Sequence, residues 1–241
     1  MKPGFFFSCR QRSRQVLLAG LLAVGCAGGA VAGDNPHDPY EGFNRMMFAV
    51  NEIVDQYAAR PVARAYDEAV PLPVKASVGN AFGNVADLWI GVNSALQGKF
   101  SNAGVDLGRL LINSTLGIFG LFDVATELGL EKHDEDFGQT LAVWGVGDGG
   151  YLFWPLIGAR SVRDTFGFVV DAAVDPLAST EPIPVRNSLR GLRFADLRAS
   201  LLATDKVVDE ASLDKYAYIR DAYLQRRRSQ IFDGRPPRLD D

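Results

Sequence analysis

Apolar residues recur at intervals of three and four along much of this chain, which is the spacing of one face of an α-helix. The pattern covers residues 38–55, 74–97, 194–208 and 214–231. In the first of these segments the apolar positions are Phe43, Met46, Met47, Val50, Ile53 and Val54. A half-buried strand would instead alternate every two residues. We therefore predict an all-α fold of short amphipathic helices with glycines at their hinges.

Between these segments, prolines interrupt the pattern. Residues 60–63 read Arg-Pro-Val-Ala, residues 71–73 read Pro-Leu-Pro, and residues 172–193 are punctuated by Pro and Ser. Proline lacks the amide N–H that a helix interior needs. We therefore predict breaks at the first two places and a connection over residues 172–193.

The densest apolar region is residues 100–130. Its longest uncharged run, residues 110–122, has 13 residues and lies between Arg109 and Asp123. A membrane-spanning helix needs about 20 apolar residues, so this length is typical of a core helix or of a re-entrant or interfacial segment.

Residues 144–164 combine glycines, aromatic residues and a proline. Gly145, Gly147 and Gly150 match the G-x-G-x-x-G spacing of dinucleotide-binding loops. Pro155, however, stands where the phosphate-binding helix would have to run. We therefore reject that interpretation and predict a turn-rich apolar segment that ends at Pro155, followed by a helix that begins near Ser161.

The aromatic residues of this segment allow two interpretations. Tyr151, Phe153 and Trp154 are side chains typical of the level where protein meets lipid headgroups, because Tyr and Trp are apolar with one polar edge. They are equally typical of a buried aromatic core.

The N-terminus has the features of an export signal. Residues 1–25 begin with basic side chains and continue with an uncharged apolar run from residue 16 to residue 25. Two processing sites compete: a lipobox-like segment that ends at Cys26, with its Leu one place further from the cysteine than usual, and Ala30-Val31-Ala32, which suits ordinary cleavage. Only the first would place a lipid on Cys26. We predict a tether over residues 26–37.

Composition narrows the possible functions of the exported part. Both cysteines, Cys9 and Cys26, lie in or at the end of the signal, so we predict no disulfide in the folded domain. Four of the 25 Lys and Arg residues belong to the signal, which leaves 21 cationic side chains against 29 Asp and Glu. An acidic domain is a poor partner for nucleic acid.

Candidate catalytic chemistry is sparse. His133 lies in an acidic stretch, residues 131–136, which is more typical of a solvated loop than of a metal site. The sequence has no G-x-S-x-G, paired-cysteine or H-E-x-x-H motif, so we predict no catalytic residue, metal or cofactor. Arg109 with Asp106 or Asp123, and Arg163 with Asp164, could be structural ion pairs or could line a polar lumen.

Several blocks in order resemble a known family. They are Asp38-Pro39 with Gly42-Phe43-Asn44-Arg45, Arg60-Pro61-Val62, Gly108-Arg109 with Asn113-Ser114-Thr115-Leu116-Gly117, Gly120 with Asp123-Val124-Ala125, Phe137 to Leu141, Gly145-Val146-Gly147 with Tyr151, Pro155, Gly158, Arg163-Asp164, and Tyr216 to Arg226. Their order is similar to that in the MlaA (VacJ) family of Gram-negative outer-membrane lipoproteins, over roughly residues 38–228.

The resemblance implies a helical ring embedded in one leaflet of the outer membrane, beside a porin trimer. It further implies an amphipathic channel through which phospholipids leave the outer leaflet, pass to a soluble periplasmic carrier and then reach an inner-membrane ABC transporter. On this basis the family-motif positions are Asn44, Arg45, Arg109, Asn113 and Asp123. The candidates for the channel and its lip are Gly145, Gly147, Tyr151, Trp154, Pro155, Arg163 and Asp164.

We therefore expect a single lipid-transport domain over residues 38–231 and a disordered tail over residues 232–241. Two other functions stay open. An exported lipid hydrolase would need a nucleophile beside a base such as His133. An adhesion or scaffold lipoprotein would need neither chemistry nor a channel.

Overall fold

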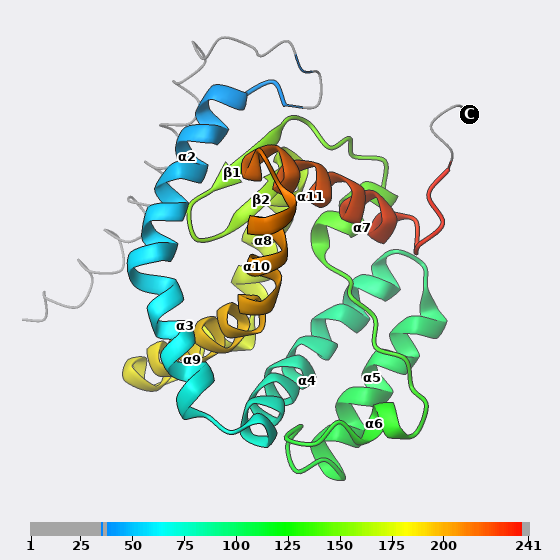
Figure 1. Ribbon diagram of the computed structural model, residues 1–241. Coiled ribbons are helices and arrows are strands. Elements are labelled where there is room, and N and C mark those ends of the chain that lie inside the picture. Colours follow the sequence, from blue (N-terminus) through cyan, green and yellow to red (C-terminus); the bar gives the residue numbers. More distant parts are fainter. Residues whose placement is uncertain (1–34, 36–37, 238–241) are drawn as a thin grey trace, which may run out of the picture.

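The computed structural model describes residue 35 and residues 38–237 (Figure 1). The predicted signal, its cleavage sites, Cys26, most of the tether and the last four residues lie outside the described part. The described helices are α2 (Glu41–Val54), the π-helix η1 (Asp55–Ala59), α3 (Arg60–Ala69), α4 (Leu72–Leu96), α5 (Phe100–Thr115), α6 (Val124–Glu127), α7 (Phe137–Val143), α8 (Val162–Val174), the 3₁₀-helix η2 (Pro176–Ala178), α9 (Ile183–Ser200), α10 (Leu202–Ala211) and α11 (Lys215–Ile231).

The first three helices run into one another as a long rod at one side of the molecule (Figure 1). The predicted break at residues 60–63 is wrong, because Pro61 stands in the first turn of α3, where a missing N–H is tolerated. The π-helix η1 joins α2 to α3 instead.

The helices α4 and α5 form an antiparallel pair at the opposite side (Figure 1). The turn between them contains Gly98 at φ +80°, a conformation that glycine adopts without a steric penalty. Polar side chains join the pair: Ser94 donates to Asp106 at 2.9 Å and Asn84 donates to Ser114 at 2.9 Å. The 13-residue apolar run is split, because α5 ends at Thr115 and a loop with several exposed apolar residues follows.

A β-hairpin corrects the prediction of a turn-rich segment before Pro155. Strand β1 (Tyr151–Trp154) pairs antiparallel with β2 (Gly158–Ser161), with Tyr151 opposite Ser161. Asn44 of α2 binds the outer edge of β1, accepting from the Phe153 amide at 2.9 Å and donating to the Tyr151 carbonyl at 3.0 Å. The strand thus depends on a side chain more than 100 residues away, which local spacing does not reveal.

Two helix boundaries in the C-terminal half also differ from expectation. The segment 172–193, predicted as a connection, contains the start of α9, whose Pro184 again lies in the first turn. The helix predicted over residues 194–208 is divided at Leu201 into α9 and α10. The predicted start near Ser161 is confirmed, since Ser161 caps α8 by accepting from the Asp164 amide at 3.0 Å.

Polar side chains occupy much of the interior. The apolar centre is a cluster of Tyr151, Phe153 and Tyr216, against which Phe48 packs edge-to-face. The other fully buried large side chains are polar or charged, among them Arg109, Gln139 and Asn93. Many large apolar side chains are exposed instead. No described helix is long and apolar enough to cross a bilayer.

Candidate functional site

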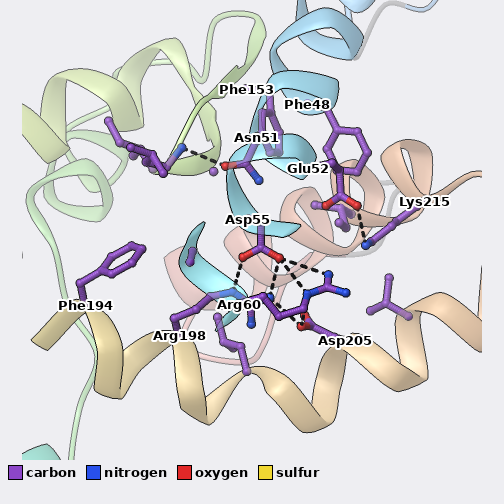
Figure 2. Close-up of a pocket in the computed structure, with 17 residues that line it drawn as sticks. Phe48, Asn51, Glu52, Asp55, Arg60, Phe153, Phe194, Arg198, Asp205 and Lys215 are labelled. Atoms are coloured by element: carbon purple, nitrogen blue, oxygen red, sulfur yellow. Dashed lines mark hydrogen bonds and ion pairs between the residues drawn. The ribbon is translucent and has the colours of Figure 1, made fainter. Parts of the chain in front are cut away.

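A cavity of about 220 Å³ lies between α2, η1, the β-hairpin, α9, α10 and α11. One part of its wall is apolar, formed by Phe48, Phe153, Leu156, Phe194 and Ile219. The remainder carries ionisable groups from α2, η1, the start of α3 and the C-terminal helices, as Figure 2 shows. The cavity is therefore amphipathic, with a side for hydrocarbon and a side for charge.

Its charged wall is centred on Asp55, the first residue of the π-helix. Arg198 of α9 donates from Nε and Nη2 to the two oxygens of Asp55, at 2.6 and 2.7 Å. The same guanidinium reaches Asp205 at 2.6 Å, and Arg60 donates to Asp55 at 3.1 Å (Figure 2). These hydrogen bonds, above all that of Arg198, hold the pKa of Asp55 below its usual value. The carboxylate therefore stays ionised and joins two parts of the chain that lie far apart in sequence.

A second cavity, of about 540 Å³, adjoins the first. It is lined by Glu52, Gln56, Arg60, Arg64, Asp209 and Lys215, three of which also line the first cavity. Its wall is almost entirely polar. Below, the first cavity is called the apolar cavity, after its apolar wall, and the second is called the polar vestibule.

Two of the family-motif positions, Asn44 and Arg45, are structural. Besides binding β1, Asn44 donates to Asp38 at 2.8 Å, and Asp38 accepts from the Tyr216 hydroxyl at 2.5 Å. Arg45 forms ion pairs with Glu41 and Asp214 and lies over the ring of Tyr216. The start of α2 is thereby fixed to the start of α11.

Arg109 is only 1% exposed, and its two Nη atoms donate four hydrogen bonds. It donates to both oxygens of Asp123 at 2.9 Å, to Thr126 at 3.0 Å and to the Leu130 carbonyl. Asn113 donates to Asp123 at 2.9 Å and accepts from the Ala125 amide. Burial alone would raise the pKa of Asp123, but hydrogen bonds from Thr126, Asn113 and Arg109 lower it to about 2. Of the two partners considered for Arg109, Asp123 is the one that it binds, and the pair is structural.

Arg163 and Asp164 form a second buried network, so they are structural and do not line a lumen in this structure. Arg163 binds both Asp164, at 3.0 Å, and Asp148. Arg227 of α11 bridges Asp164 at 2.8 Å and Asp136 at 2.6 Å. Burial by itself would raise the pKa of Asp164, but Arg227 and the Tyr223 hydroxyl hold it below its usual value. Sequence reasoning missed Arg227, because its partners are more than 60 residues away.

The expected lip residues divide into two groups. Of the two interpretations of Tyr151, the buried aromatic core is the one that the structure has: its side chain is 1% exposed, because β1 turns it toward Tyr216 and Tyr223, so it is not at a channel lip here. Trp154 is half-buried and donates to Thr165 at 3.1 Å. Gly145 and Gly147 are exposed, and Pro155 is half-buried. In the same segment the exposed large apolar side chains are Trp144, Val146, Leu156 and Ile157.

His133 does not form a catalytic triad with its neighbours. Its Nδ1 lies 2.7 Å from Asp106, whose other oxygen accepts from Ser94. The carboxylate thus stands between serine and histidine, whereas a triad needs the histidine in the middle to take the serine proton. Within the described residues, no group of three or more His, Cys, Asp or Glu side chains could hold a metal ion.

Comparison with known proteins then gives the family. The family model for the MlaA lipoprotein matches residues 36–230. The chain belongs to the MlaA family. The "Intermembrane phospholipid transport system lipoprotein MlaA" of Shigella flexneri is 35% identical over 219 residues, which cover 89% of this chain and 86% of the relative. The protein of the same name from Escherichia coli K12 has the same identity and coverage.

A further relative and a solved structure extend the MlaA comparison. An uncharacterized protein of Rickettsia bellii is 37% identical over 196 residues, which cover 81% of this chain and 77% of that protein. A solved structure from work on the "Structural basis for maintenance of bacterial outer membrane lipid asymmetry" matches with a TM-score of 0.70 and 32% identity. The match covers 82% of this chain and 99% of the solved one. The match confirms the predicted helical class, and the described part of this chain is helical apart from one small hairpin.

Proposed function

We propose that this chain is an outer-membrane component of a phospholipid transport system that maintains the lipid asymmetry of that membrane. Family membership, the names of the Shigella and Escherichia relatives and the subject of the solved structure support the proposal. In this role the chain binds and conducts phospholipid without chemical conversion. Lipid movement is driven by the difference in chemical potential between membranes and by partner proteins.

The amphipathic cavity is the observation that carries the proposal. A phospholipid has an apolar part and a charged part, and the cavity offers an apolar wall around Phe153 and Phe194 beside the Asp55–Arg198 network. Burial of apolar surface contributes about 25 cal/mol per Å². An acyl chain against the first wall is therefore stabilised while its headgroup stays near polar groups.

Exposed apolar side chains support a location in the membrane. Leu116, Ile118, Phe119, Leu121 and Phe122 are all exposed in the loop after α5. Such an apolar patch is costly in water and marks a surface that meets lipid or protein. We propose that this loop lies in one leaflet and that Gly145, Gly147, Trp154 and Pro155 belong to the lip of a channel within a ring of helices.

The remaining parts of the proposal concern anchoring and partners. A lipid on Cys26 would hold the chain at the periplasmic side of the outer membrane, since two or more acyl chains give stable anchoring. A porin trimer would adjoin the embedded helices, and a soluble periplasmic carrier would receive the phospholipid. Replacement of Cys26 by Ala with palmitate labelling tests the anchor: loss of label supports lipidation, and an unchanged label and mature mass contradict it.

Outer-leaflet phospholipid in a deletion strain tests the function. We expect deletion to raise the phosphatidylethanolamine that reacts with an impermeant amine reagent, and the wild-type gene to restore the low level. Phe194→Asp should restore it poorly because a charge enters the apolar wall of the cavity, whereas Phe194→Leu should restore it well. Phe194 is partly exposed, so the change need not unfold the protein.

The same assay separates the alternatives. His133→Ala should leave clearance intact, whereas a hydrolase that uses His133 as its base would lose it. If deletion leaves outer-leaflet phospholipid unchanged, the scaffold alternative holds and the transport proposal fails.

A further inference from the structure

The polar vestibule next to the apolar cavity carries an uneven distribution of charge. Its cationic side chains are Arg60, Arg64 and Lys215, and its carboxylates are Glu52 and Asp209. Because Glu52, Arg60 and Lys215 also line the apolar cavity, a molecule that extends from one cavity into the other passes these three side chains. What such a molecule would meet depends on which charges are already paired.

Arg64 is the cation of the vestibule that has no charged partner among the described residues. The contacts of Arg60 are to Asp55 and Asp205, made through Nε and Nη2. Arg64 follows one helical turn later in α3, on the same face, and is exposed. It makes no ion pair or hydrogen bond with any residue in the described part of the chain. Its five N–H donors are therefore free for a ligand.

Around Lys215, in the same vestibule, carboxylates outnumber cations. Lys215 binds Glu52 at 2.8 Å and Asp209 at 3.1 Å, so that one ammonium group faces two carboxylates. Asp209 is half-exposed and its only ion pair in the described part is with Lys215. The two arginines Arg60 and Arg198 are balanced by Asp55 and Asp205. Two charges of the vestibule are left without a counterpart among the described residues: the guanidinium of Arg64, and one of the two carboxylates that share Lys215.

We propose that this vestibule binds the zwitterionic headgroup of a phospholipid, with the phosphodiester on Arg64 and the ammonium group on Asp209 and Glu52. The inference rests on the proposed function, because the acyl chains of the same lipid would occupy the apolar cavity. An arginine can donate two parallel hydrogen bonds to a phosphate, which suits it to this role better than a lysine. A headgroup with a phosphate and an amine satisfies both unbalanced charges, whereas an anionic glycerol headgroup satisfies only one.

The test measures binding of short-chain lipids to the full mature chain held in amphipol. The probes are dihexanoyl phosphatidylethanolamine, dihexanoyl phosphatidylglycerol, dihexanoylglycerol and inorganic phosphate, each below its aggregation concentration. We expect the wild-type protein to bind phosphatidylethanolamine most tightly. Arg64→Gln should weaken the binding of both phospholipids about tenfold, because one charge-assisted contact to the phosphate is lost. The affinity for dihexanoylglycerol, which has no phosphate, should not change. Asp209→Asn should weaken the binding of phosphatidylethanolamine and leave the affinity for phosphatidylglycerol unchanged.

Arg190→Gln is the matched control. Arg190 is an exposed arginine on α9 that lines neither cavity, so its replacement should change no affinity. The proposal would be overturned if the Arg64→Gln variant bound both phospholipids as tightly as the wild type does. It would also be overturned if Asp209→Asn lowered the affinities for phosphatidylethanolamine and phosphatidylglycerol equally. Inorganic phosphate that binds as tightly as the phospholipids would show a free-anion site and would also overturn it. If the wild-type protein binds neither phospholipids nor dihexanoylglycerol, the proposed function itself fails.

Discussion

At the scale of single residues, the buried charges of this chain occur in bonded groups. Arg109 with Asp123, and Arg163 with Asp164, are adjacent or separated by one short segment, so the sequence suggested both pairs. The same sequence gave no sign of Asp55 with Arg198 or of Asp164 with Arg227, because those partners meet only through the tertiary fold. Residue type thus indicated which charges need partners, and only the structure identified the distant ones.

Replacing Arg109 by Leu should destabilise the protein strongly. The change leaves Asp123 and Asp87 without the guanidinium that faces them, and loss of one partner from a buried pair costs about 3–5 kcal/mol. Thermal unfolding in detergent measures the effect as a lower midpoint. Arg190→Leu, at an exposed position, should shift the free energy of unfolding by less than about 0.5 kcal/mol. Equal midpoints for the two variants would mean that the Arg109 network contributes nothing to stability.

At the scale of elements, helical spacing predicted α2, α4 and α11 and failed at the β-hairpin and at the start of α9. The segments around α2, α4 and α11 have continuous apolar periods, and the structure has helices there. The hairpin was missed because Asn44 supplies hydrogen bonds to β1 from another element. The start of α9 is hidden in the sequence because Pro184 interrupts the pattern, although a proline in the first turn is compatible with a helix.

The contact between α7 and α8 depends on two glycines that face each other. A Cβ atom at Gly167 would lie 2.4 Å from the backbone nitrogen of Gly138, closer than packed atoms allow. We therefore expect Gly167→Ala to separate the two helices and to lower the unfolding midpoint. Gly104→Ala, in the middle of α5 with open space around the position, should instead raise stability by about 0.5–1 kcal/mol, because alanine loses less backbone freedom on folding. A Gly167→Ala protein as stable as the wild type would contradict this packing.

At the scale of the whole molecule, apolar side chains lie outside and many polar side chains lie inside. The apolar run of the 100–130 region is typical of a core helix or of a re-entrant or interfacial segment, and in the structure its side chains are largely on the surface. Sequence established how apolar this region is and that it is too short to span a bilayer. It did not establish which way the side chains point, because glycine-rich turns after α5 break the helical period.

Phe119 is the clearest test of this surface. It is 84% exposed and adopts φ +56° in the loop after α5, a backbone conformation that aspartate tolerates better than most residues. We expect Phe119→Asp to reduce the fraction of protein that floats with phospholipid vesicles, while the unfolding midpoint in detergent changes little. Phe119→Leu should float like the wild type. If the aspartate variant also floats fully, this loop does not enter the bilayer.

The pairing of Asp55 with Arg198 joins positions 143 residues apart, and each wall of the apolar cavity combines residues from the N-terminal and C-terminal helices. Contacts between such distant positions form late in folding, because a long loop must close before they are made. In the role proposed above, an exported chain that is still folding therefore has its first helices but not the complete cavity, and it holds no lipid until α9 to α11 have docked. Assembly order alone would thus keep an unfinished molecule from taking up lipid before it is complete.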